Sequence, residues 1–189
     1  TYNWLRKKNR LYEDQLNHLR KYKVTFQNQL SICFPGYLDL FKDGYSDIPM
    51  TILKKYPHPD LLKNKKAETV ARYLEKNTCH THKVSLEYAL KIIGFAKKTY
   101  PGCEKDDVEV EIFKILLDKV IETQRECEKT LNEMITVAST LEEYRYISSI
   151  DGIGPNLAAR IIAEIGDIEE FKSREALVAY AGLDPHIYQ

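Results

Sequence analysis

Apolar positions near the start of the chain recur at alternating spacings of four and three residues. This is the heptad pattern of a helix that packs along one seam. The seam positions are Leu5, Asn9, Tyr12, Leu16, Leu19, Lys23, Phe26, Leu30 and Cys33. Only Asn9 and Lys23 are polar, so we expect one long amphipathic helix in this part of the chain.

A second seam with the same stepping follows after about eighty residues. Its positions are Phe113, Leu117, Val120, Gln124, Cys127, Leu131, Met134, Ala138 and Leu141. Gln124 is its one polar member. The pattern predicts a second long helix that continues to position 141.

The two predicted helices fit together as an antiparallel hairpin. In that register Leu5 meets Leu141 and Cys33 meets Phe113, and the one polar position of the second seam then faces Lys23. This match favours pairing within one chain. A heptad seam also suits pairing with a second copy, so both arrangements stay open.

A compact insert is predicted between the two long helices. Phe34-Pro35-Gly36 breaks the first helix, and Tyr100-Pro101-Gly102 closes the insert. Between these breaks the apolar spacing predicts three short helices, at about 49 to 55, 65 to 76 and 84 to 98.

The Gly-Ile-Gly run at positions 152 to 154 is followed by Pro155 and an alanine-rich apolar helix that stops at Gly166. Glycine takes a positive φ freely, and proline suits the first helical turn. Helix, tight turn and helix resemble the helix-hairpin-helix motif, a non-specific binder of the DNA backbone. Unpaired N–H groups at a helix start bind anions. A plain connection between two helices, without a ligand, is the alternative.

The end of the chain carries further capping signals. Asp167 precedes a short acidic stretch in a capping arrangement, and Ser173 caps a last helix at about 174 to 181 that Gly182 ends. No strand is predicted anywhere.

The predicted fold is therefore all-α. It comprises a long antiparallel helical coiled-coil pair with a small helical insert, followed by a helix-hairpin-helix-like segment. The four segments are the first coiled-coil helix (1–36), the insert (37–102), the second coiled-coil helix (103–145) and the last segment (146–189).

Composition favours a folded protein outside the membrane. Hydrophobic residues make up 43% of the chain and no segment is of low complexity. The apolar runs are too short to span a membrane and no secretory leader opens the chain, so we expect a cytoplasmic protein. Because it begins with Thr1, we also expect an excerpt of a longer protein.

The net charge of zero conceals an asymmetry. Residues 1 to 100 hold 19 basic against 9 acidic residues, and residues 101 to 189 hold 9 against 19. The basic clusters are Arg6, Lys7, Lys8 and Arg10, then Arg20, Lys21 and Lys23, and then Lys54, Lys55, Lys63, Lys65 and Lys66. Such clusters attract phosphates, although a solvated helix face explains any one of them. Residues 141 to 189 hold 4 basic against 9 acidic residues, so the amide geometry at Gly152 and Gly154 has to outweigh the local charge.

The sulfur and imidazole groups do not predict a metal site. Cys33, Cys79, Cys103 and Cys127 show no C-x-x-C spacing. Cys79-His80-Thr81-His82 offers three ligands, and the sequence gives no fourth.

Several features in this order resemble the one-ten family of insertion-sequence transposases, the relatives of the Piv-type DNA invertases. They are a basic helix ending near Phe34-Pro35, the step Tyr56-Pro57-His58-Pro59, the long second helix, Ile150-Asp151-Gly152-Ile153-Gly154, Glu164-Ile165-Gly166-Asp167, Phe171, and Ala179-Tyr180-Ala181-Gly182-Leu183-Asp184-Pro185. The C-terminal third carries the specific part of the resemblance.

The resemblance implies a division of labour in the whole protein. An N-terminal RuvC-like domain supplies four acidic ligands for a divalent metal such as magnesium, a C-terminal transposase domain supplies a serine nucleophile, and a coiled-coil segment joins them. A structured guide RNA directs recombination. This chain resembles the joining segment and the start of the transposase domain. The acidic ligands are expected before Thr1 and the serine beyond Gln189, so we predict no catalytic residue, metal or cofactor in this chain.

The predicted partners are DNA and structured guide RNA, and the full protein is expected to be a homo-oligomer. The amides of Gly152, Gly154 and Asn156 would face phosphate, and Arg160 would pair with it. Long-range attraction would come from Arg6, Lys7, Lys8 and Arg10.

The sequence leaves two alternatives to this interpretation. Tyr188 with His186 suits a tyrosine recombinase, but that chemistry needs an arginine cluster, and only Arg160 and Arg174 lie near in the sequence. The other is a non-enzymatic helical adaptor that uses the coiled coil for protein association.

Overall fold

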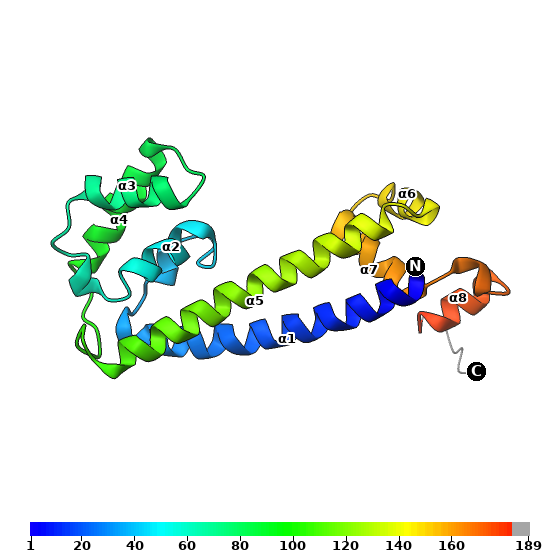
Figure 1. The fold of residues 1–189 in the computed structure, drawn as a ribbon, viewed down its shortest axis with the longest axis horizontal. Helices are drawn as coiled ribbons and strands as arrows, with labels where there is room; N and C mark the ends of the chain where they lie inside the picture. Colours follow the sequence, from blue (N-terminus) through cyan, green and yellow to red (C-terminus); the bar gives the residue numbers. More distant parts are fainter. Residues whose placement is uncertain (183–189) are drawn as a thin grey trace, which may run out of the picture. The chain divides into compact units, whose positions relative to one another are not determined.

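A computed structural model of the chain describes residues 1–182, in which helices are joined by turns and loops, with no strand among them (Figure 1). The helices are α1 (Tyr2–Cys33), α2 (Asp47–Lys55), α3 (Ala67–Asn77), α4 (His82–Ala96), α5 (Val108–Ala138), α6 (Glu142–Ser148), α7 (Pro155–Ile165) and α8 (Arg174–Tyr180). Short 3-10 turns lie at Leu38–Leu40, Pro59–Leu61 and Ile168–Glu170. The predicted all-α fold class is confirmed.

One helix ends earlier than its apolar pattern predicts. The α5 helix stops at Ala138, and Leu141 takes an extended conformation at the start of α6. The hydroxyls of Ser139 and Thr140 donate to the carbonyls of residues 136 and 137, at 2.9 and 2.8 Å. Such local bonds compete with the helical ladder. The seam therefore breaks before its last predicted position.

The chain divides into two compact units. Unit 1 comprises Thr1–Leu16 and Glu126–Gln189, of which the structure describes the residues up to 182, and unit 2 comprises Asn17–Arg125. The long helices α1 and α5 contribute one half to each unit. Each unit has its own buried side chains, so each is described by itself.

In unit 2 the end of α1 lies antiparallel to the start of α5, but not in the predicted register. The rings of Phe26 and Phe113 stack with centroids 5.3 Å apart. Gln29 donates to the carbonyl of Glu109 at 3.0 Å, and the Cys33 sulfur lies 3.5 Å from the same oxygen. The predicted pairing of Cys33 with Phe113 is wrong by about two helical turns. We attribute the shift to the two large rings, which bury each other fully.

The polar match predicted for Lys23 is not formed. Its ammonium group instead lies 4.0 Å from the ring centroid of Tyr45. A cation over an aromatic face is attracted by the ring quadrupole, and the lysine stem covers apolar surface. The heptad positions of α1 are nevertheless all buried or half-buried, as the pattern predicts.

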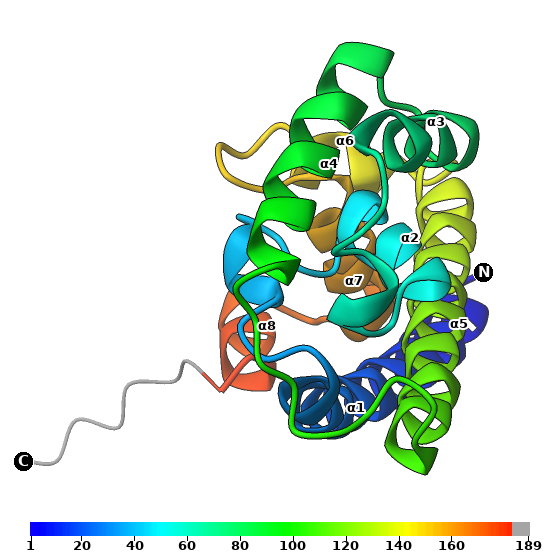
Figure 2. The ribbon, with the colours of Figure 1, turned by 90° about the vertical axis from the view of Figure 1, so that its left-hand side faces the viewer.

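The insert of unit 2 folds around aromatic side chains, and α3 and α4 pack against each other within it (Figure 2). The ring of Phe34 lies 4.9 Å from that of Tyr37 and 6.1 Å from that of Phe95. The buried Tyr37 hydroxyl donates to the carbonyl of Pro49 at 3.0 Å, and burial raises its pKa well above the usual value. This cluster links the end of α1 to α2 and α4.

The buried His58 has a structural role. Its Nδ1 accepts from the Asp60 amide at 3.3 Å, so its Nε2, 3.1 Å from the Cys103 carbonyl, carries the hydrogen and donates. The Cys103 sulfur in turn lies 3.9 Å from that of Cys33. Burial raises the pKa of the Cys33 thiol to about 12, so this thiol stays protonated and packs as a small apolar group.

The core of unit 1 is built from α1, α5 and α7. Its fully or almost fully buried members are Leu5, Met134, Ala138, Ala159, Ile162 and Ala163. Alanines on the inner face of α7 allow its backbone to come close to the long helices. Burying a side chain as large as Leu5 contributes about 1.5–3 kcal/mol. This packing fixes the position of α7 within the unit.

A polar contact closes the edge of this core. The Tyr2 hydroxyl donates to the Glu143 carboxylate at 2.5 Å. This bond raises the pKa of Tyr2 to about 12 and lowers the pKa of Glu143. It joins the start of α1 to α6.

We predict that Tyr2→Phe destabilises the chain by about 0.5–1 kcal/mol at neutral pH, a value reduced for partial exposure. Because folding lowers the pKa of Glu143, its contribution is present above the usual glutamate pKa of about 4.3 and is lost as the pH falls through the folded value. Because folding raises the pKa of Tyr2, its contribution is present below about pH 10 and is lost as the pH rises through about 12. Urea unfolding at several acidic and neutral pH values measures the difference.

Tyr146→Phe is the matched control, because the Tyr146 hydroxyl donates to Glu142 of the same helix at 2.9 Å and both side chains are exposed. We expect its effect to be smaller. Equal effects of the two substitutions at every pH would contradict the assigned role of Tyr2.

Candidate nucleic-acid interface

The loop between α6 and α7 in unit 1 is a tight turn. The Ile153 amide donates to the Ile150 carbonyl at 3.0 Å, which places Asp151 and Gly152 at the centre of the turn. Gly152 has a φ of +87°. A type II turn requires such a value at its third position, where residues other than glycine are strained. Gly152 is therefore required by the turn itself.

The start of α7 is exposed and lacks a side-chain cap. Gly154 stands at the N-cap with a φ of −83°, and no side chain bonds to the first amides. The first turn contains no acidic residue, and Gly154, Pro155, Asn156 and Leu157 are all exposed. A helix leaves its first N–H groups without partners inside the helix, and here they face solvent. This geometry can bind an anion.

Arg160, the predicted phosphate partner, already has a partner in unit 1. Its guanidinium group donates to the Glu13 carboxylate and lies 5.5 Å from the ring centroid of Tyr12. Both charged side chains are about 37–38% exposed. A phosphate would therefore have to compete with Glu13 for Arg160.

The four basic residues near the start of α1 differ in their surroundings. The Lys8 ammonium group lies 2.6 Å from the Glu133 carboxylate and 5.4 Å from the Trp4 ring centroid. Arg6 lies against Gly166, where a Cβ would come within 2.8 Å of its guanidinium. Lys7 and Arg10 are exposed. Arg6 and Lys8 are half-buried, so the exposed pair is Lys7 and Arg10.

Most of the predicted site residues fall into two groups at opposite ends of α7, and Arg160 lies in the middle of that helix. Arg160 contacts Glu13, Glu164 accepts from Asn9, and Gly166 lies at Arg6, so α7 runs antiparallel to the first part of α1 (Figure 1). The basic start of α1 thus lies beside the C-terminal end of α7. The glycine loop lies at the N-terminal end, about 16 Å away along a helix of 11 residues. The structure does not bring the two groups together.

Sequence reasoning missed three side chains beside the loop. Arg145 lies in the last turn of α6, the turn that leads into the loop, and it is exposed. Ile150 is 55% exposed and Leu157 is 45% exposed, so apolar surface flanks the free amides. The sequence signal that could have found Arg145 is a basic residue shortly before the Gly-Ile-Gly run.

The other candidate site residues either have partners within the chain or lie outside the described residues. His80 lies 3.2 Å from Asp47 and His82 lies 3.1 Å from Glu75, and no group of three possible ligands is placed for a metal within residues 1–182. Ser173 accepts from the Ala176 amide at 3.3 Å and so caps α8. Tyr188 and His186 lie outside the described residues, as do residues 183–185 of the C-terminal motif.

Residues 144–189 match the sequence profile of a family described as "Transposase IS116/IS110/IS902 family". This part of the chain is similar to transposases of that family. The match begins inside α6 and covers the glycine loop, α7 and α8. No curated protein and no solved structure matches the chain. Up to residue 182, every helix falls short of the length and hydrophobicity that crossing a bilayer requires.

We predict that Glu13→Gln raises the affinity of the chain for duplex DNA about threefold, because Arg160 then becomes free to contact a phosphate. Fluorescence anisotropy at fixed salt measures the affinity. Glu128→Gln, an equal charge change at an exposed position of α5 in unit 1, controls for general electrostatics. Arg160→Met added to Glu13→Gln should remove the gain, and equal gains from both glutamate substitutions would exclude a role for Arg160.

Proposed function

We propose that this part of a transposase binds the sugar-phosphate backbone of DNA during transposition. The observation that carries the proposal is the exposed, uncapped start of α7 behind the glycine turn, inside the segment that matches the transposase family. The amides near Gly152, Gly154 and Asn156 would donate to phosphate oxygens, and Arg145 would add a charge beside them. The chain then acts in binding and positioning.

Such a site reads phosphate and not bases. Backbone amides and a helix dipole interact with a phosphodiester in any sequence, so the site would bind DNA without sequence specificity. The same contacts suit structured guide RNA, which we propose as a second ligand. We favour DNA for the loop because transposition acts on DNA. Lys7 and Arg10, beside the other end of α7, would add long-range attraction for either polymer.

The glycines of the chain offer a matched test. A Cβ at Gly154 meets no heavy atom within 4 Å, and its φ of −83° suits alanine. Gly154→Ala should therefore keep the fold while its methyl group obstructs close approach of a phosphate. We predict about tenfold weaker binding of duplex DNA, or roughly 1.4 kcal/mol.

Gly94→Ala is the control, because a Cβ there also meets no heavy atom within 4 Å and Gly94 lies in α4 of unit 2. Its affinity for DNA should equal that of the unsubstituted chain. Anisotropy titrations at two salt concentrations give both values. The loop is not a DNA contact if the two alanine variants bind equally well.

A second candidate function, protein association, has an observation of its own. Val108, Ile112 and Ile115 form a stripe at helical spacing on α5, and they are 58, 40 and 62% exposed. An apolar stripe on a polar helix face is typical of a helix that pairs with another helix. We propose that this stripe serves self-association of the chain.

We predict that the chain forms a dimer and that Ile115→Lys shifts it to the monomer by placing a charge within the apolar contact. Sedimentation equilibrium measures the association constant. Val24→Lys, at a 58% exposed position of α1, is the control and should leave the constant unchanged. A monomeric unsubstituted chain, or equal effects of both lysines, would rule out association through this stripe.

A further inference from the structure

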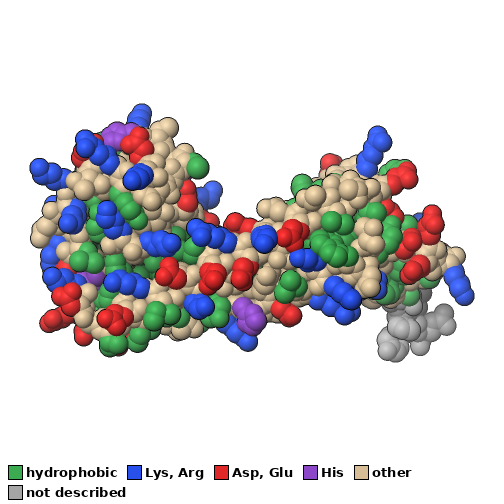
Figure 3. Space-filling model, viewed as in Figure 1, with side chains coloured by type: hydrophobic (Ala, Val, Ile, Leu, Met, Phe, Trp, Pro, Cys, Tyr) green, Lys and Arg blue, Asp and Glu red, His purple; other side chains and the backbone are tan. Residues whose placement is uncertain are grey.

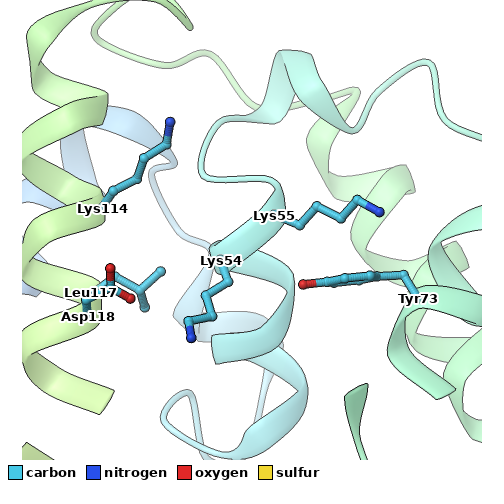
Figure 4. A pocket seen from close by; sticks show the side chains of 6 residues that line it. All are labelled: Lys54, Lys55, Tyr73, Lys114, Leu117 and Asp118. Atoms are coloured by element: carbon cyan, nitrogen blue, oxygen red, sulfur yellow. The ribbon is translucent and has the colours of Figure 1, made fainter. Parts of the chain in front are cut away.

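A lysine-lined hollow lies within unit 2, on elements that the family match does not cover. It has a volume of about 450 Å³ and is lined by Lys54, Lys55, Tyr73, Lys114, Leu117 and Asp118 (Figure 4). Lys54 and Lys55 come from the last turn of α2, Tyr73 from α3, and the others from α5. Three helices thus line one hollow with three lysines and one carboxylate, and the ammonium groups of the lysines point in different directions (Figure 4).

The positive charge of this hollow is only partly neutralised by the chain. Among residues 1–182, none of the ion pairs involves Lys54, Lys55 or Lys114, and all three side chains are exposed. Asp118 supplies the only negative charge in the lining. Basic side chains also gather over the insert in Figure 3, in a protein whose net charge is zero. The hollow therefore presents a local excess of positive charge.

The end of α2 explains only part of this arrangement. Lysines in the last turn of a helix complement its dipole, which accounts for Lys54 and Lys55 without a ligand. Lys114 lies well inside α5, where no helix end requires a cation. Its position opposite the end of α2 is the feature that indicates a ligand.

Two aromatic contacts prepare the hollow for binding. The Lys55 ammonium group lies 4.2 Å from the ring centroid of Tyr73 and 5.6 Å from that of Tyr56. This placement holds the Lys55 ammonium group at the two rings, so the lysines left to contact a ligand are Lys54 and Lys114. Figure 4 shows the Tyr73 hydroxyl turned toward α2. Burial raises the pKa of Tyr73, so the hydroxyl stays protonated and can donate a hydrogen bond.

We propose that this hollow binds a nucleic-acid backbone, with the exposed ammonium groups of Lys54 and Lys114 contacting phosphate oxygens along it and Tyr73 as a hydrogen-bond donor. Lysine acts as a point charge toward phosphate and does not select a base sequence. The volume exceeds what one phosphate needs and leaves room for the adjoining sugar. The site belongs to unit 2 and does not depend on the glycine loop of unit 1.

The test compares matched lysine substitutions. Lys54→Gln with Lys114→Gln removes two charges from the hollow, and Lys76→Gln with Lys83→Gln removes two from exposed positions of α3 and α4. We expect the first pair to weaken duplex DNA binding about tenfold and to reduce the slope of log affinity against log salt by about one, near the 0.9 expected per phosphate contact. The control pair should change the affinity less than twofold. Equal effects of the two pairs would overturn the proposal.

Asp118→Asn tests the same site in the opposite direction. Removing the carboxylate should strengthen duplex binding about threefold, whereas Glu111→Gln, at an exposed position of the same helix, should have less effect. Both comparisons are repeated in the Gly154→Ala variant. The effect of the hollow on DNA affinity can then be measured whether or not the glycine loop binds DNA. Unchanged binding in Asp118→Asn would count against the hollow.

Inorganic phosphate, added at constant ionic strength, distinguishes the two sources of the anion. We expect it to compete weakly with the duplex for the unsubstituted chain, and less for the Lys54→Gln and Lys114→Gln variant. If phosphate binds but duplex affinity is insensitive to both lysines, the hollow serves a free anion and the nucleic-acid proposal is overturned.

Discussion

The close approach of α7 to α1 and α5 is the constraint on which unit 1 depends. Ala159 and Ala163 allow the helix backbone to come near Leu5 and Met134, and Ile162 fills the space beside them. A larger side chain at either alanine would push α7 outward, because cores are packed to near crystalline density. With this inner face buried, Pro155, Asn156 and Leu157 at the start of α7 are exposed, and the glycine loop joins the helix there.

The acidic composition of the C-terminal part takes on a different meaning in the folded chain. Glu133 is used to hold Lys8, and Glu164 holds Asn9 of α1. Glu13 in turn holds Arg160. Several carboxylates and basic residues therefore serve the packing of unit 1. The start of α7 has no acidic residue in its first turn, so the local charge at the amides differs from the average of the segment.

The sequence predicted the helices well because their information is local. The heptad seam of α1, the glycine before α7 and the Ser173 cap each depend on neighbouring residues. The register of the long helices was not predictable in this way, since it depends on whether Phe26 stacks on Phe113 across the unit. The partners of Lys8 and Arg160 and the lysine hollow also involve residues far apart in the chain. The hydroxyl bonds of Ser139 and Thr140 that end α5 at Ala138 are also local. They were missed because Leu141 continues the apolar spacing past the end of the helix.

Backbone amide shifts during a DNA titration test the central claim most directly. In nitrogen-edited spectra of the isotopically labelled chain, a short DNA duplex should shift the amides of Gly152, Gly154 and Asn156, and added salt should reverse the shifts. The amide of Gly94 should stay unchanged, because it lies in α4 and belongs to neither proposed site. Binding of the duplex that leaves the three loop amides unshifted would contradict the assignment of the α7 start as a phosphate contact.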